Sequence, residues 1–560
     1  MRGALLSIIS LVAAASCAMS PAFLAADEQE ASVYGAFLAG RYAGSARDTD
    51  ASARFYGDAL ALDPESDFLS ERAFYAALLA GDFDLADASA ATAAEAPDSP
   101  QLAQIYAVAA DLADGRVNAL LAETPEEFGA FGSLLDEILD QWGLIARGRR
   151  AEAEAAASEL DTPLAASGHV LVHRALIFEA AGRMDRAEDA YRAAAGSLDM
   201  EAFTTLLLGE FLERRGRRAE AAALYEQELE RADHEDAALL DALERVRARR
   251  RAPRMPDAPE AAARALLAPS AMLAGSAPVE YTALYLRLIQ RLDPEFDRNT
   301  LHLAGVLEEL EMTDAALAAY GRLADGPFAQ RAAVDAAWLE FRLGNREVAM
   351  ARAATLTETT DARAPRLLLA DLHRLSGQCE TAADIYADVI DARREAGEPV
   401  DWRYYFYEGV CRQTAGDWDA AEALFLQALD VAPDEPRILN HLGYNWIVLE
   451  ENAERGFEMV ARAAELAPDN GAILDSLGWG HFKEGRHDEA VRWLEDAVER
   501  SPADPTINWH LGDAYAAVGR SLEARFQWRR ALELDPDSRE RALIERRLEQ
   551  GLAAGPRDIR

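Results

Sequence analysis

Three residue types recur with a period of about 34 residues in the last third of this 560-residue chain. Glycine, alanine and proline each appear once per period, at fixed distances from one another. The recurring residues are Gly409, Gly443, Gly478 and Gly512, then Ala428, Ala463, Ala497 and Ala531, and then Pro433, Pro468, Pro502 and Pro536. Three independent marks with one period predict a repeated two-helix unit that stacks on its neighbours, not a single globular core.

The unit from Gly471 to Asp504 shows how each repeat is built. Apolar and small residues at spacings of three and four form two stripes, which is the period of an α-helix. Gly485 separates the stripes, and Pro502 ends the second because proline cannot continue a helix. The first stripe holds Leu474, Leu477, Gly478 and His481, and the second holds Ala490, Leu494, Ala497 and Val498. Each unit is therefore predicted to be a pair of helices joined by a short turn.

The order of these residues resembles the tetratricopeptide repeat family. That family has a small residue at the eighth position of its unit, alanines at the twentieth and twenty-seventh, and a proline at the thirty-second. Residues 402–536 match the pattern over four consecutive units, and weaker copies extend upstream. The unit that begins near Pro436 departs from it, with one extra residue in its turn and Gly456 in place of alanine. The resemblance implies an all-α, right-handed superhelical solenoid of helix-turn-helix repeats.

Composition and register divide the chain into six parts. These are a signal peptide (1–26), a degenerate repeat array (27–247), a linker rich in proline and arginine (248–268), a middle helical array (269–400), a well-matched array (401–536), and a capping helix with a tail (537–560). The linker is expected because Pro253, Pro256 and Pro259 interrupt the helical pattern. In the capping helix, we expect Leu543, Ile544 and Leu548 to face inward and Arg539, Arg541, Arg546 and Arg547 to stay in water.

Charge and the first residues bear on the compartment. A net charge of −41 repels nucleic acid at long range, so no nucleic-acid partner is expected. Arg2, a short apolar core from Ala4 to Ala15 and small residues before Asp27 are typical of an export signal. The sequence predicts an exported, periplasmic protein. Cys17 supplies an alternative, since Ala14-Ala15-Ser16-Cys17 weakly resembles a lipoprotein cleavage box, and lipidation there would attach the protein to the outer membrane.

The other two cysteines are Cys379 and Cys411. In the repeat register, one lies in a turn and the other on the first helix of the next unit. A disulfide and a pair of buried thiols both remain open, because sequence spacing does not fix the distance between them.

Motifs of catalysis are missing from the sequence. It contains no G-x-S-x-G, H-E-x-x-H or C-x-x-C motif, and no phosphate-binding loop surrounds Lys483. His169 and His173 are four residues apart and could face one metal, but no third ligand accompanies them, so a surface pair is favoured. We predict no enzymatic activity, no metal and no cofactor. An active site within residues 101–165 or 250–300 is the alternative.

A partner-binding face is predicted on the first helix of each repeat. The second, fifth, ninth, twelfth and thirteenth positions lie opposite the core stripe, and the resemblance implies that they line a concave groove for a peptide or helix. They include Arg403, Phe406, Arg437, Asn440, Tyr444, Asp475, Trp479, Phe482, Lys483, Trp509 and Asp513. Alternatively, Trp479 and Tyr444 pack on neighbouring first helices. We expect a scaffold of the bacterial envelope that binds proteins, or a lipid-anchored assembly factor if Cys17 is modified.

Overall fold

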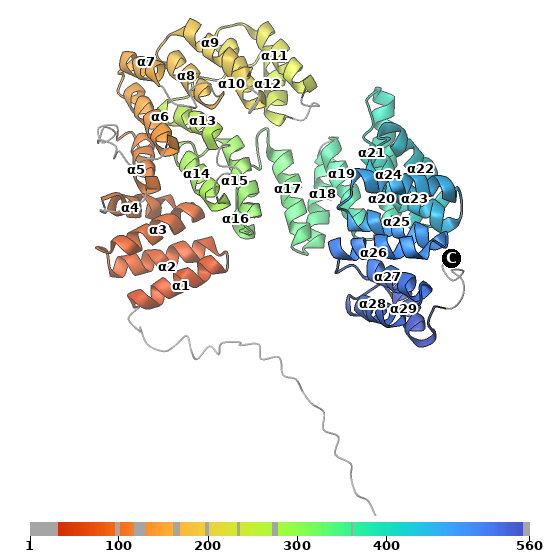
Figure 1. The fold of residues 1–560 in the computed structure, drawn as a ribbon. Coiled ribbons are helices and arrows are strands. Elements are labelled where there is room, and N and C mark those ends of the chain that lie inside the picture. The colour runs from red at the N-terminus through yellow and green to blue at the C-terminus, as the bar shows by residue number, and fades with distance from the viewer. Residues whose placement is uncertain are drawn as a thin grey trace, which may run out of the picture. The chain divides into compact units, whose positions relative to one another are not determined.

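The computed structural model describes residues 32–95, 101–116, 130–160, 168–196, 201–231, 236–270, 278–359 and 362–552. Every regular element in these ranges is an α-helix (Figure 1), so the predicted all-α repeat fold is confirmed. The predicted signal peptide and Cys17 lie outside the described residues. The chain forms two compact units, Met1–Leu339 (unit 1) and Glu340–Arg560 (unit 2).

The helices of unit 1 are α1 (Val33–Ser45), α2 (Thr49–Leu62), α3 (Asp67–Ala80), α4 (Phe83–Glu95), α5 (Gln101–Ala113), α6 (Ala130–Ala146), α7 (Arg150–Glu159), α8 (Gly168–Ala180), α9 (Met184–Ala195), α10 (Glu201–Arg214), α11 (Arg218–Arg231), α12 (Ala237–Arg247), α13 (Ala258–Ser270), α14 (Val279–Leu292), α15 (Asp297–Glu309) and α16 (Thr313–Gly321). The boundary falls within α17 (Ala329–Arg342). Unit 2 continues with α18 (Arg346–Thr359), α19 (Arg363–Leu375), α20 (Cys379–Ala396), α21 (Trp402–Thr414), α22 (Trp418–Val431), α23 (Pro436–Leu449), α24 (Ala453–Leu466), α25 (Gly471–Lys483), α26 (His487–Arg500), α27 (Pro505–Ala517), α28 (Ser521–Glu533) and α29 (Ser538–Gln550).

Local signals set the ends of these helices. Asp504 caps α27, because its Oδ1 accepts hydrogen bonds from the backbone N–H groups of Thr506 (2.8 Å) and Ile507 (3.2 Å). Pro505 stands at the first helical position, where a missing N–H costs nothing. Gly485 has a φ of +77° between α25 and α26, a backbone conformation that favours glycine. Gly485 therefore marks a turn, and Asp504 and Pro505 mark the start of a helix.

The repeat that begins near Pro436 departs from the family pattern because α23 and α24 are in close contact. A Cβ atom on Gly456 would lie 2.7 Å from the Gly443 carbonyl oxygen, and one on Gly443 would lie 2.6 Å from the Gly456 oxygen. The two backbones touch, so alanine does not fit where the family pattern expects it. The extra residue lies in the turn, where Glu450 and Asn452 both adopt the left-handed conformation.

The predicted linker is wrong from residue 258 onward, because residues 258–268 belong to the buried helix α13. Asp257 and Glu260 form a reciprocal capping box at its start, with distances of 3.0 and 3.2 Å between backbone nitrogen and carboxylate oxygen. Pro259 lies in the first turn, where proline is tolerated. The expected separation of residues 27–247 from 269–400 also differs from the structure, which keeps both sides of this segment in unit 1 as far as Leu339.

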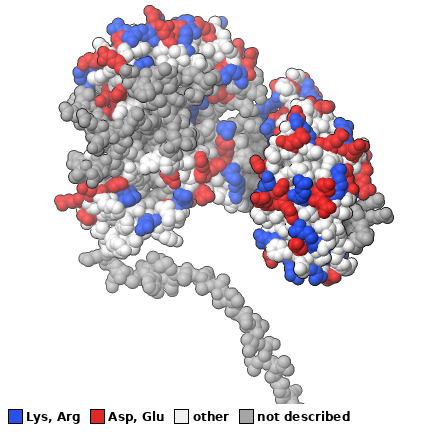
Figure 2. Space-filling model, in the orientation of Figure 1, with Lys and Arg blue, Asp and Glu red and all other residues white. Residues whose placement is uncertain are grey.

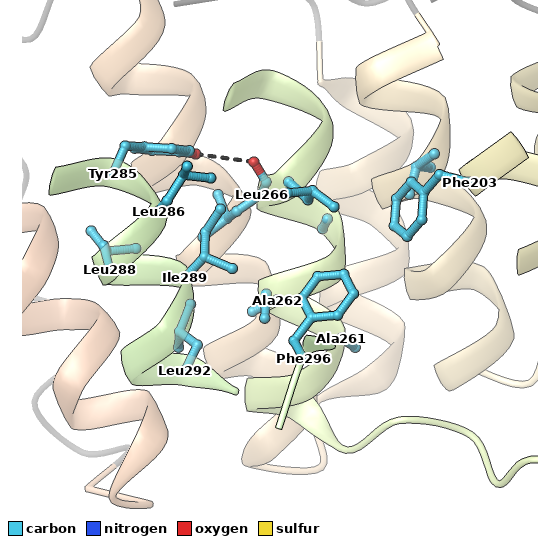
Figure 3. Close-up of a cluster of buried hydrophobic side chains, with 14 of the residues drawn as sticks. Phe203, Ala261, Ala262, Leu266, Tyr285, Leu286, Leu288, Ile289, Leu292 and Phe296 are labelled. Carbon is cyan, nitrogen blue, oxygen red and sulfur yellow. Dashed lines mark hydrogen bonds between the residues drawn. The ribbon is translucent and has the colours of Figure 1, made fainter. Parts of the chain in front are cut away.

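Helices α13 and α14 fill the interior of unit 1. In Figure 1 the helices from α5 to α12 arch around them, and α13 contacts α5, α6 and α8 while α14 contacts α3 and α5. Figure 3 shows their packed side chains, including Ala261, Ala262 and Leu266 of α13, with the Tyr285 hydroxyl 3.3 Å from the Leu266 carbonyl. Helices α13 and α14 thus cover the face of the N-terminal helices that points into unit 1.

Charged contacts hold α14 in that position. The Arg291 guanidinium lies 2.8 Å from both Asp87 and Asp114, and Arg287 donates to the Leu79 carbonyl at 3.2 Å. These contacts join segments about two hundred residues apart in the sequence, so a local sequence pattern cannot predict them.

We predict that Gly456→Ala lowers the stability of unit 2 by about 1–3 kcal/mol, because the added methyl group meets the Gly443 carbonyl. The matched control is Gly305→Ala in α15, where a Cβ atom meets nothing within 4 Å and alanine should stabilise by about 0.5–1 kcal/mol. Urea unfolding followed by circular dichroism measures both. Equal effects of the two substitutions would contradict the close contact.

Candidate partner-binding site

The residues predicted to line the groove divide into a buried group, a partly accessible group and an accessible group. The buried group comprises Asp475 (6% exposed), Trp479 (3%), Phe482 (7%), Trp509 (4%) and Asp513 (0%). The prediction that these five side chains are available to a partner is therefore wrong for this conformation. The physical reason is that α25 and α27, the first helices of adjacent repeats, contact each other directly.

The aromatic side chains of this buried group stack on one another. The Trp479 ring lies parallel to Phe482 with centroids 4.7 Å apart, and it also stacks on His510 at 4.0 Å. Trp509 meets the Trp479 ring edge-on at 5.2 Å. These rings form one cluster with the second helices of their repeats, so they stabilise the fold, as the alternative for Trp479 anticipates.

The buried acidic residues have internal partners. Both carboxylate oxygens of Asp475 lie within 2.9 Å of His510 Nδ1. Asp513 accepts hydrogen bonds from Trp528 Nε1 at 3.0 Å and from Arg547 Nε at 3.2 Å. Arg547, expected in water, is buried by this contact. Burial raises the pKa of Asp513 to about 6, while Arg547 and the Trp528 N–H favour its ionised form.

Four other predicted residues are partly accessible. Tyr444 packs against the aromatic cluster, and its burial raises the pKa of its hydroxyl. The Lys483 ammonium lies 3.7 Å from Glu450. Phe406 is half-buried and meets the rings of Phe425 and His441. Asn440 is half-buried, and its side-chain oxygen accepts no hydrogen bond from the described residues.

Arg403 and Arg437 form the accessible group, each with a side chain that is 50% exposed. Both guanidinium groups lie over the ring of Trp402, at 5.1 and 4.7 Å from its centroid. Such cation–π contacts orient each guanidinium while leaving its N–H groups available. We call Trp402, Arg403 and Arg437 the arginine–tryptophan site.

The two arginines are held in equivalent ways in consecutive repeats. Asp401 caps α21 and binds the Arg403 side chain at 2.8 Å, and Glu435 caps α23 and binds Arg437 at 2.8 Å. Each carboxylate thus neutralises part of the charge but occupies one edge of the guanidinium. Figure 2 shows acidic and basic side chains interspersed over the visible face of unit 2.

Unit 1 contains a polar cavity of about 160 Å³ that is lined by Phe203, Phe296, Phe328 and three arginines. Each arginine already has a carboxylate partner: Arg245 binds Glu213 at 2.8 Å, Arg264 binds Asp293 at 3.1 Å and Arg298 binds Asp236 at 3.1 Å. The volume is below the range of about 300–1,000 Å³ that is typical of small-molecule sites. These ion pairs therefore join helices of unit 1.

The expectation that His169 and His173 form a surface pair is wrong for His173. His173 is buried and lies 2.7 Å from Gln141 Oε1, and the side chain of His169 is outside the described residues. In the part of the chain that the structure describes, no group of three or more potential ligands is arranged around a metal position. None of the described helices has the length and apolar character needed to cross a bilayer.

Profiles of the tetratricopeptide repeat family match residues 204–237, 367–436, 412–471 and 476–539. The chain is a tetratricopeptide repeat protein. A TPR repeat-containing protein of Pseudomonas aeruginosa is 37% identical over 81 residues, which are 14% of this chain and 14% of that protein. The Hsp70-Hsp90 organising protein of Plasmodium falciparum is 39% identical over 51 residues, 9% of this chain and 20% of that protein.

A solved tetratricopeptide repeat protein from Parabacteroides merdae aligns with 46% of this chain and 99% of its own length, at 13% identity and a TM-score of 0.37. The chain matches less than a quarter of the length of the two curated relatives. The tetratricopeptide fold implies a scaffold for protein–protein interaction, and the family is generally non-enzymatic.

One feature of the candidate site escaped the sequence prediction. Trp402 was not among the predicted groove residues, although it supports both arginines. The signal is an acidic residue, one intervening residue and an arginine, at 401–403 and again at 435–437, one repeat later. A search for charged pairs with the repeat period would have found the site.

We predict that Trp479→Ala destabilises unit 2 of this tetratricopeptide protein by about 3 kcal/mol, because it removes a buried ring from the stacked cluster. Leu522→Ala is the control, since Leu522 is 83% exposed and the change should cost within about 0.5 kcal/mol. Chemical unfolding of both variants tests the structural role. Little loss of stability in Trp479→Ala would mean that the ring is free to meet a partner.

Asp513 gives a pH-dependent prediction. Its pKa in the fold, about 6, exceeds its ordinary value of 3.8, so the folded state binds the proton more tightly than the unfolded state. Its contribution to stability should increase as the pH falls from about 6 toward 4. In Asp513→Asn this increase is absent, so the difference in unfolding free energy between wild type and variant should grow in favour of wild type on acidification. A difference that does not change with pH between 4 and 7 would contradict it.

Proposed function

We propose that this protein is a non-enzymatic scaffold that binds an acidic segment of a partner protein at the arginine–tryptophan site. The observation that carries the proposal is the pair of half-exposed arginines, one repeat apart in the sequence, that both contact the ring of one tryptophan. They occupy the second position of consecutive first helices, where the family resemblance implies a binding face.

Accessibility favours this site over the rest of the predicted groove. The inner face of unit 1 is covered by α13 and α14, and the aromatic residues of α25 and α27 pack on one another. Each arginine side chain is half-exposed, with Asp401 as the partner of Arg403, and Glu435 and the Tyr407 hydroxyl as partners of Arg437. Both ion pairs are partly exposed to solvent. Such pairs contribute at most about 1 kcal/mol, so exchanging them for a partner's carboxylates costs little.

The net charge of −41 does not oppose this choice. At physiological ionic strength, interactions between exposed charges are largely screened beyond about 8 Å. The two local arginines therefore decide the contact at short range, and the distant acidic residues mainly slow the approach. Both guanidiniums lie near one ring, so an extended peptide with two carboxylates no more than about 10 Å apart could contact both in bidentate geometry.

The location belongs to the same proposal. The apolar core and the small residues within 1–26 support export to the bacterial envelope, and Cys17 supports a lipid-anchored form as the second candidate. Intact-mass measurement of the mature N-terminus from the native cell distinguishes the two. A mass that includes residues 1–26 would contradict export by this signal.

Binding can be tested with Arg403→Glu combined with Arg437→Glu, which reverses the charge of the site. Proteins crosslinked to the wild type in the native cell should fall at least tenfold in recovery with this double variant, and wild-type binding should weaken as salt rises. The matched control is Arg462→Glu on α24, whose side chain is 48% exposed and also lies in surface ion pairs.

Circular dichroism should show the same helical content in all three proteins. Equal recovery of partners by the double variant and the Arg462 control would refute the proposed site, and loss with both would point to a general effect of charge.

A further inference from the structure

The remaining cysteines of the described chain lie together between two repeats. Cys379 is the first residue of α20, and Cys411 lies in α21, which packs directly against α20. Both belong to one small cluster with Ala370, Ala382 and Tyr386. The Cys379 side chain is within hydrogen-bonding reach of the Cys411 thiol. The sequence left the disulfide and the free thiols open, and the fold brings the two side chains together in one cluster.

We propose that Cys379 and Cys411 form a disulfide when the protein meets an oxidising compartment. The bond would join the second helix of one repeat to the first helix of the next, at the start of the array that matches the family. Cysteines on two helices in direct contact can reach the Cα separation of about 4.4–6.8 Å that a disulfide needs. The proposal is independent of the partner-binding site, because it concerns the stacking of α20 on α21.

Exposure decides the order of the two chemical steps. Cys379 is half-buried and accessible, whereas Cys411 is fully buried, and burial raises the pKa of the Cys411 thiol to about 12. The Cys379 thiolate therefore attacks a low-molecular-weight disulfide first, which forms a mixed disulfide and releases one thiol. Cys411 then attacks the Cys379 sulfur, its proton passes to the departing thiolate, and a second thiol leaves. The protein loses two hydrogen atoms, and the small disulfide gains them.

The surroundings favour completion of the second step. The buried neighbours of Cys411 in this cluster are Ala370, Ala382, Ala383 and Tyr386, so apolar side chains surround the thiol where it meets the mixed disulfide. The bond would close a loop of about one repeat, and such a crosslink limits the unfolded chain much more than the folded one. In secreted proteins this type of bond persists because no reducing pool opposes it.

The experiment uses the full-length protein, equilibrated with oxidised and reduced glutathione, alkylated and digested with trypsin. The expected product is a crosslink between the tryptic peptides 375–393 and 404–412, lost after reduction. Cys17 lies in a different tryptic peptide and does not interfere. Recovery of both cysteines in alkylated form after equilibration with excess oxidised glutathione would overturn the proposal.

Two variants check the assigned order. Cys411→Ala should trap one glutathione on Cys379, and Cys379→Ala should leave the folded protein with an unmodified Cys411. A stable glutathione adduct on Cys379 of the wild type would show that Cys411 does not reach it, and would also overturn the proposal.

The oxidised wild type should unfold roughly 5 °C or more above the reduced form, and neither variant should show this shift. The wild-type peptide map does not depend on the stability of either variant.

Discussion

Three repeats of unit 2 depend on one contact, in which a large side chain of the second helix rests against a glycine of the first. A Cβ atom on Gly409 would lie 2.7 Å from Phe425, one on Gly478 would lie 2.7 Å from Leu494, and one on Gly512 would lie 2.5 Å from Trp528. The large residue changes from repeat to repeat while the glycine stays. A close-packed interface tolerates this variation because the missing side chain leaves one cavity that different rings and branches can fill.

The same contact explains why the last third of the fold can be predicted from the sequence. Glycines, alanines and prolines at the repeat period specify helix pairs within about 34 residues, so their geometry is local. The repeat that begins near Pro436 has an equally local explanation. Gly456 replaces alanine there because the backbone of Gly443 comes within contact distance. Helix α13 could also have been predicted, because Asp257 and Glu260 have the spacing of a capping box. The three nearby prolines favoured a linker instead.

The angle between consecutive repeats could not be predicted, and the candidate site depends on it. Periodicity predicted Trp479 and Trp509 on the side of their helices away from their own core stripe. It could not show that α25 and α27 lie close enough for these rings to meet. The distance between these helices depends on how the side chains of several repeats pack together, and periodicity does not give that packing. Arg403 and Arg437 were predicted on the same criterion, and they differ because Trp402 lies beneath them and leaves their outer faces in solvent.

Helix α29 is held on α27 by contacts between residues that are one repeat period apart. Thr506 donates to Glu540 at 2.6 Å, and Asp513 accepts from Arg547, and each pair is 34 residues apart. Helix α29 therefore lies in the register of a further first helix, although no second helix follows it among the described residues. A buried ion pair adds little net stability because both charges lose water, but a wrong register would leave each charge unpaired at a cost of about 3–5 kcal/mol. Apolar contacts of Leu543 and Ile544 attract α29 to the edge, and the charges select one position for it.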